Sequence, residues 1–196
     1  MQARRFVLKT SVAIALASAA LAGCSTTGSN PPPTAQTNDA RRQSIDASVD
    51  GTLSRLFQTV PGSRELVGKA RGVLVFPQVI QAGIGIGGEH GDGALRVGGS
   101  TVGYYSTTGA SVGATLGMQS KAVVYLFMTQ DALDRLRTSE GWSVGGDASV
   151  ALVKVGANGS IDTTTAVKPV EVFVLTNSGL IGDLSLGTTK ITQLKL

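Results

Sequence analysis

The stretch "AGIGIGGEHGDG", residues 82–93, decides how this chain folds, because two kinds of fold compete for it. Gly83, Gly85 and Gly88 fit the pattern G-x-G-x-x-G, which marks a dinucleotide site when a strand runs into the first glycine and a helix opens at the third. Here Pro77 interrupts the approach to Gly83, and the many glycines that follow Gly88 do not favour a helix. We therefore predict a strand at this point and no nucleotide site.

The glycines then need another explanation, which the geometry of a strand supplies. Side chains alternate between the two faces of a strand, so Gly83, Gly85 and Gly87 share one face that carries no side chains. Glycine weakens a strand interior unless another segment approaches it closely. We predict such an architectural contact at these three glycines, and close approach of a ligand is the alternative.

From residue 72 onward, short β-branched segments alternate with turn residues, which is typical of antiparallel sheets. One helix is predicted near 130–138, with Thr129 as its N-cap and with Leu133 and Leu136 facing inward. The fold class is therefore α+β, with predominantly antiparallel β-structure in a β-rich domain at 72–196. The predicted strands are 72–76, 82–88, 94–99, 101–106, 110–117, 121–128, 142–155, 170–175, 180–187 and 189–194.

Residues 40–71, ahead of the strands, are predicted to form an amphipathic helical segment. Asp39 is expected to cap a first helix at 40–60, and Ser63 a shorter one at 63–70. The stripe of the first helix either packs on the sheet or lies in a membrane surface, and we expect it to pack while the arginines face lipid. This apolar stripe recurs at intervals of three and four: Ile45, Val49, Leu53, Leu56, Phe57 and Val60.

The first residues of the chain are predicted to be an export signal. "MQARRFVLK" is basic, and the apolar "TSVAIALASAALAG" that follows is short for a membrane span. The segment ends at Leu21-Ala22-Gly23-Cys24, which resembles the lipobox of bacterial lipoproteins. That resemblance implies cleavage after residues 1–23, a diacylglycerol on the Cys24 sulfur and an acyl chain on its new amine. Ser25 then implies anchoring in the outer membrane, facing the periplasm.

Two alternatives to this interpretation stay open. The signal is an ordinary secretory one if Cys24 follows it by chance, and "RRFVLK" also resembles the twin-arginine export signal, so the Sec and twin-arginine routes both remain. Residues 24–39 are the lipidated cysteine and a flexible tether, because "STTGSNPPPTAQTN" is polar and contains three consecutive prolines.

Removal of the signal changes what the charge implies. The full chain has a net charge of +4, but Arg4, Arg5 and Lys9 leave with the signal, which reduces it to +1. The sequence therefore gives no reason to expect a nucleic-acid partner. The remaining positive charge is concentrated near the lipid end, where we expect membrane contacts from Arg41, Arg42, Arg55, Arg64, Lys69 and Arg71.

The sequence carries no signature of an enzyme. His90 is the only histidine, and its neighbours Glu89 and Asp92 in a glycine-rich segment are typical of a solvated turn rather than of a metal site. No serine lies in a G-x-S-x-G motif, and the sole cysteine is assigned to lipid. Glu89 and Asp92 would suit hydrolysis, but many domains offer such a pair. We expect no catalysis, no metal and no cofactor beyond the acyl chains on Cys24.

Four phrases within residues 62–196 carry a family resemblance: "GKARGVLVFPQVIQAGIGIGGEHGDGALRVGG", "TVGYYSTTGASVGATLGMQSKAVVYLFMTQDALDRLRTSEGWSVGGDASVALV", "GSIDT" and "VFVLTNSGLIGDLSLGTTKITQL". With these phrases in this order, residues 62–196 resemble the SYLF domain family. The resemblance implies a lipid-binding domain with a basic amphipathic N-terminal helix. The phosphoinositides and actin of eukaryotic members are not expected in a bacterial envelope, so only affinity for anionic lipid carries over.

We therefore expect a bacterial envelope lipoprotein whose SYLF-like domain binds lipid or an anionic membrane surface without catalysis. The alternative is an envelope structural or adaptor protein that binds another protein through a sheet edge or through the glycine-rich strand face. Salt distinguishes the two, because lipid binding by basic residues weakens as the ionic strength rises.

Overall fold

The computed structural model describes residues 35–144, 149–153, 161, 168–176, 179–180 and 188–196; the side chains of 35, 84–86, 111–117, 179–180 and 188 lie outside this description. The predicted signal and most of the predicted tether therefore fall outside the described residues. Residues Pro33–Leu196 form one compact unit, separate from Met1–Pro32.

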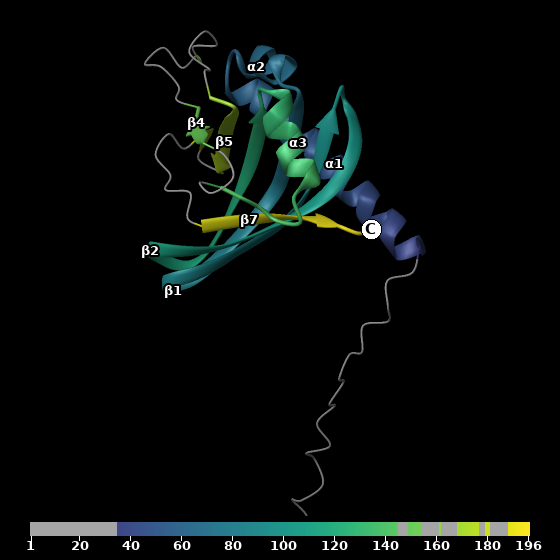
Figure 1. Ribbon diagram of the computed structural model, residues 1–196. Helices are drawn as coiled ribbons and strands as arrows, with labels where there is room; N and C mark the ends of the chain where they lie inside the picture. Colours follow the sequence, from purple (N-terminus) through teal and green to yellow (C-terminus); the bar gives the residue numbers. More distant parts are fainter. Residues whose placement is uncertain (1–34, 145–148, 154–160, 162–167, 177–178, 181–187) are drawn as a thin grey trace, which may run out of the picture. The chain divides into compact units, whose positions relative to one another are not determined.

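Two long antiparallel strands dominate the sheet: β1, Gly72–Val97, and β2, Ser100–Phe127 (Figure 1). They are joined by Gly98 and Gly99, whose φ angles of 60° and 86° are those of a tight hairpin turn that favours glycine. The six short strands predicted between 72 and 128 are therefore wrong as separate elements. The glycine-rich segments between them are paired within the β1–β2 ladder and do not form turns.

The ladder between β1 and β2 bends at three places. Its register shifts between Phe76 and Val79, between Ile84 and Ile86, and between Leu95 and Arg96. Shifts of this kind bend a strand and increase its twist without ending it. This is why Pro77 and the glycines of 82–93 are compatible with one continuous strand.

The remaining strands complete the sheet around β2. β5, Val170–Thr176, pairs with one half of β2, and β7, Thr188–Leu194, pairs with the other half. Three short strands lie beyond them: β3, Trp142–Ser143, on β7, and β4, Val150–Leu152, and β6, Gly179–Leu180, on β5. Among the strand pairs of the described residues, only β4–β5 is parallel, so the predicted α+β class with mainly antiparallel strands is confirmed. Of the predicted strand 142–155, the described residues include β3 and β4, while 145–148 and 154–155 lie outside the description. Of the predicted strand 180–187, residues 181–187 lie outside the description.

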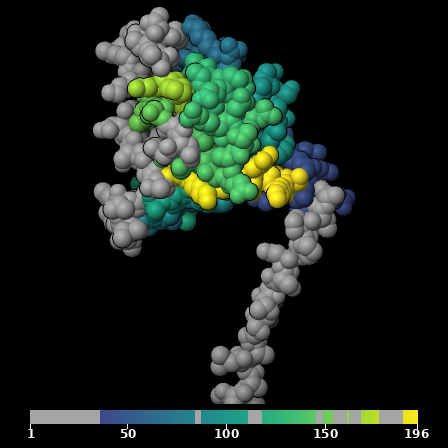
Figure 2. Space-filling model, viewed as in Figure 1, coloured from purple at the N-terminus to yellow at the C-terminus, as the bar shows by residue number. Residues whose placement is uncertain are grey.

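The first helix, α1, spans Ala35–Thr59 and starts earlier than predicted. Asp39 lies inside the helix, where its carboxylate accepts a hydrogen bond from Arg42 at 2.7 Å. Its predicted role as N-cap is therefore wrong, and residues 35–39 of the predicted tether are helical. The C-terminus reaches the same helix, because the Leu196 carbonyl accepts a hydrogen bond from Arg42 (Figures 1 and 2).

The second and third helices follow their predicted positions. In α2, Ser63–Lys69, Gly62 occupies the N-cap position and Ser63 is buried, so the predicted cap at Ser63 is wrong. The Ser63 hydroxyl instead donates to the carbonyls of Leu56 and Val60, which fixes α2 to the end of α1. In α3, Gln130–Thr138, the Thr129 side chain accepts from a backbone N–H of the first turn, as predicted.

Helices cover both faces of the sheet, α1 and α2 on one side and α3 on the other (Figure 1). Alternate residues of each strand enter the two cores: Leu74 packs with α3, whereas Val73 and Val75 pack with α1 and α2. In β2 the run Ala122–Phe127 is buried on both faces, which is why it is apolar without alternation. Figure 2 shows the α3 side, where green atoms cover the sheet.

β1 curls until its second half lies against its first. A Cβ on Gly91 would lie 2.5 Å from the Gln78 carbonyl oxygen, and one on Gly93 would overlap the Val75 carbonyl and approach Phe76 Cδ1 to 2.7 Å. A close backbone approach is thus observed at Gly91 and Gly93, whereas the contact predicted at Gly83, Gly85 and Gly87 stays a prediction. The side-chain environment of Gly85 lies outside the described residues.

Candidate membrane-binding surface

The apolar stripe of α1 faces the sheet. Ile45, Val49, Leu56 and Val60 are at most 8% exposed and belong to the core on that side. The expectation that the stripe packs on the sheet is therefore confirmed. Membrane contact by this domain must use other residues.

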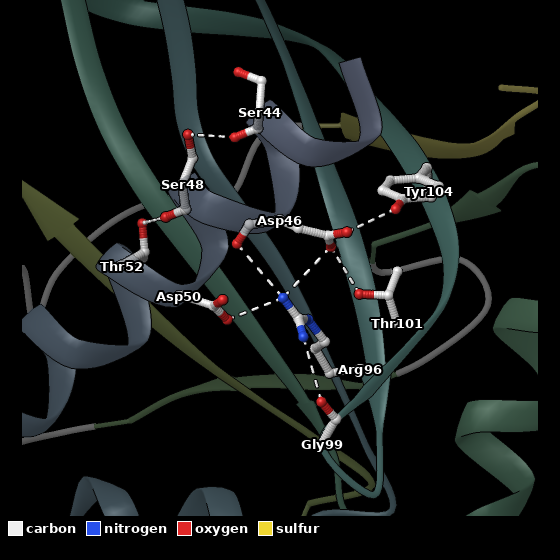
Figure 3. Close-up of polar contacts among 9 residues, drawn as sticks. All are labelled: Ser44, Asp46, Ser48, Asp50, Thr52, Arg96, Gly99, Thr101 and Tyr104. Carbon is white, nitrogen blue, oxygen red and sulfur yellow. Dashed lines mark hydrogen bonds and ion pairs between the residues drawn. The ribbon is translucent and has the colours of Figure 1, made fainter. Parts of the chain in front are cut away.

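A polar cluster ties α1 to the β1–β2 hairpin (Figure 3). Arg96 of β1 is 16% exposed, and its guanidinium lies 2.9 Å from Asp50 Oδ1 and 3.4 Å from Asp46 Oδ1. Thr101 and Tyr104 of β2 donate hydrogen bonds of 2.7 and 2.8 Å to the two oxygens of Asp46. Asp46 thus gathers three donors from two strands, and it positions the helix on the sheet.

The cluster also explains a shift in acidity. Burial raises the pKa of the Tyr104 phenol, and the hydrogen bond it donates to Asp46 raises it further. Arg96 was not among the residues predicted from the sequence, although an arginine inside the apolar segment "ALRVGG" indicates a charge that needs a partner within the protein.

Three of the six basic residues predicted to contact lipid form ion pairs within the protein. Arg41 pairs with Asp92 at 2.6 Å, Arg42 with Asp39 at 2.7 Å, and Lys69 with Glu65 at 2.8 Å. A neighbouring carboxylate offsets the attraction of each of these cations for an anionic surface. The six predicted residues are therefore not equally available to bind an anionic surface.

Three of the six have no carboxylate partner among the residues that the structure describes. The Arg64 guanidinium stacks over the Phe57 ring at 4.3 Å. Arg55 and Arg71 are exposed, and no ion pair found in the described part of the chain uses either of them. These three arginines are the cations that remain available to an external anion.

Two hollows border α1 on opposite flanks. Leu53 and Arg55 are two positions apart, which places them about 200° from each other around a helix. A cavity of about 330 Å³ lies on the Leu53 flank, between α1, α2 and the hairpin turn. Its lining is mainly apolar, and Asp50 and Arg96 of the polar cluster form one wall. The complete lining is Asp50, Leu53, Val67, Gly68, Ala70, Gly72, Val73, Arg96, Gly98 and Gly99.

The hollow on the Arg55 flank is a groove of about 370 Å³ with a polar lining. It runs between α1 and the ribbon that β1 and β2 form beside it. Arg55 is the one charged residue among the described residues that line it. This lining consists of Ser48, Gly51, Thr52, Arg55, Pro77, Gln78 and Ser120. The groove therefore favours an anion.

Glu89, His90 and Asp92 lie within β1, so the solvated turn expected there is wrong, and the three side chains do not converge. Asp92 faces α1, where it pairs with Arg41, and His90 Nε2 lies 3.8 Å from it. Glu89, the residue before His90, faces the opposite side of β1, where its Oε2 lies 2.8 Å from Lys121 Nζ. The two carboxylates lie on opposite faces of β1, which does not suit shared acid–base work, and the described residues contain no cluster of three or more metal-ligating side chains.

The family model Ysc84, described as "Las17-binding protein actin regulator", matches residues 108–195. The matched segment starts within β2, includes α3 and ends one residue after β7. No curated protein matches the chain. Among the described residues, none of the helices is long and apolar enough to cross a membrane.

Proposed function

Because the chain carries a Ysc84 (SYLF) domain, a family associated with binding of lipid or actin, we propose that it is a non-catalytic, lipid-binding lipoprotein of the bacterial envelope. In this proposal the acyl chains on Cys24 hold the protein at the outer membrane, facing the periplasm. The domain then binds the anionic surface of a bilayer.

One observation carries the proposal for the domain. After its internal ion pairs are formed, Arg55, Arg64 and Arg71 are exposed without a carboxylate partner among the described residues. Each basic residue near an anionic membrane contributes about 1 kcal/mol of attraction. Three arginines together therefore support reversible binding, to which the acyl anchor adds by keeping the domain near the surface.

Flotation with vesicles tests this proposal on the chain without residues 1–24, which retains the compact unit Pro33–Leu196 with both of its cores. We expect binding to vesicles that contain phosphatidylglycerol, weaker binding to phosphatidylcholine alone, and release as salt rises. Arg55→Glu with Arg71→Glu should reduce binding. The matched control, Arg135→Glu with Arg137→Glu on α3, reverses two exposed charges on the other side of the sheet and should not. Absence of binding to every anionic vesicle would falsify the proposal.

The printed description of the family favours a second function, since it names a protein partner and an actin regulator. Binding of an envelope protein through a sheet edge or strand face would depend less on salt than binding to lipid. Flotation that persists only when a protein partner is present, and that is insensitive to salt, would support this adaptor function.

A further inference from the structure

We propose that the Arg55 groove and the exposed pair Ile80 and Met118 form one contact site for an anionic phospholipid in a bilayer. The Arg55 guanidinium meets the headgroup phosphate, and the two apolar side chains reach the layer beneath it. This site deepens the proposed function and rests on it.

Strand register places the apolar pair beside the groove. Ile80 of β1 lies opposite Ser120 of β2, and Ala82 lies opposite Met118. Directly opposed residues share a face, as do residues two apart in one strand, so Ile80, Ser120 and Met118 lie on the same face of the ribbon. Ser120 lines the groove together with Arg55. The apolar pair therefore continues the surface on which Arg55 lies.

The pair is exposed where the chain has no charge. Met118 is 76% and Ile80 41% exposed. Residues 80–88 and 110–120, which face one another in the ribbon, contain no Asp, Glu, Lys or Arg. Exposed strands are commonly protected by charged side chains, and an apolar surface that lacks them is typical of an interaction site. Methionine also adapts readily to an irregular apolar partner.

The groove supplies the complementary charge. Arg55 is exposed and has no ion pair among the described residues, and the other residues of the lining are uncharged. A Cβ on Gly51 would find nothing within 4 Å, so the groove is open above the helix. A guanidinium binds phosphate through two parallel N–H donors. An anionic bilayer has charged headgroups above a hydrocarbon layer. Arg55 would contact the headgroups, and the exposed apolar side chains of Ile80 and Met118 would contact the hydrocarbon.

A fluorescent label can test which part of the surface enters the bilayer. Cys24 is the only cysteine, so Met118→Cys in the chain without residues 1–24 gives one site for an environment-sensitive dye. The matched control is Val102→Cys, because Val102 is 47% exposed and lies near the hairpin turn instead. With phosphatidylglycerol vesicles we expect a blue shift of the dye at position 118 and none at position 102. Equal shifts, or binding without a shift at 118, would overturn the site.

Charge changes test the same site by affinity. Met118→Glu should weaken flotation tenfold or more while Val102→Glu leaves it unchanged. Arg55→Gln should weaken it about fivefold, the equivalent of one basic residue near the surface. Wild-type affinity in the Met118→Glu and Arg55→Gln variants, with the parent chain still binding, would contradict this site and leave the broader function standing. If the parent chain binds no vesicle, both fail.

A soluble phosphate is the remaining source of the same chemistry. Glycerol phosphate at millimolar concentration should neither shift the dye at position 118 nor displace the chain from vesicles, because it offers no apolar layer. If glycerol phosphate displaces the parent chain from vesicles, and Arg55→Gln abolishes this effect, the site binds a free anion and the membrane assignment is overturned.

Discussion

Gly93 is the residue at which the curl of the sheet depends on the absence of a side chain. It lies where the second half of β1 crosses the first, against the backbone of Val75 and the ring of Phe76. The sequence predicted a close approach at Gly83, Gly85 and Gly87 from the alternation of side chains, and that contact stays a prediction. The contact at Gly93 was not predicted, because it depends on how far the strand curls.

Gly93→Ala should destabilise the domain by about 2–3 kcal/mol, because the new methyl group overlaps backbone that cannot rotate away. Gly88→Ala is the matched control in the same strand: its Cβ would meet the nearest atom, the Gly109 carbonyl oxygen, only at 4.0 Å. Urea denaturation of both variants measures the difference. Equal free energies of unfolding would mean that the crossing of the two halves is loose.

At the scale of elements, α1 shows what periodicity predicts and what it omits. The apolar spacing from Ile45 to Val60 predicted the buried stripe correctly, because burial of one face follows from the helical period. The start of the helix was placed too late, since Asp39 resembles an N-cap but pairs with Arg42 inside the helix. The hydrogen bond that Arg42 of this helix donates to the distant Leu196 carbonyl is a further feature that no local pattern reports.

The polar cluster should contribute to the attachment of α1. Asp46→Ala removes the acceptor of Thr101 and Tyr104 and leaves Arg96, which is 16% exposed, with fewer partners. We expect a loss of about 2 kcal/mol, since hydrogen bonds to charged groups are among the stronger ones.

Asp39→Ala provides the control for that loss. Its carboxylate is 63% exposed and pairs with Arg42 within one helix, so the variant should change stability by less than about 0.5 kcal/mol. Thermal melts of the two variants decide the matter. A Tm for Asp46→Ala that matches the control would show that the stripe alone holds the helix.

At the scale of the whole molecule, the sequence predicted the class of fold and its composition better than its connections. The antiparallel α+β class, the helix after Thr129 and the family followed from local patterns and from matching phrases. Local patterns did not predict that the short segments merge into two long strands, because glycine and proline are typical of bulges as well as of turns. The site shows the same division. Arg55 was predicted as a membrane contact, whereas its groove partner Ser120 comes from a strand whose register only the fold sets.

The last prediction concerns the anchor, on which the proposed location of the whole protein depends. Cys24→Ser removes the sulfur that the lipobox requires, so the chain should stay uncut and should gain no label from a radioactive fatty acid. The fold should persist, because Met1–Pro32 is separate from the compact unit that holds both cores. Ser25→Asp is the matched control: it keeps the thiol and should keep the label, while it shifts the protein from the outer to the inner membrane. Equal labelling of Cys24→Ser and the parent chain would show that the acyl chains are not attached at this cysteine.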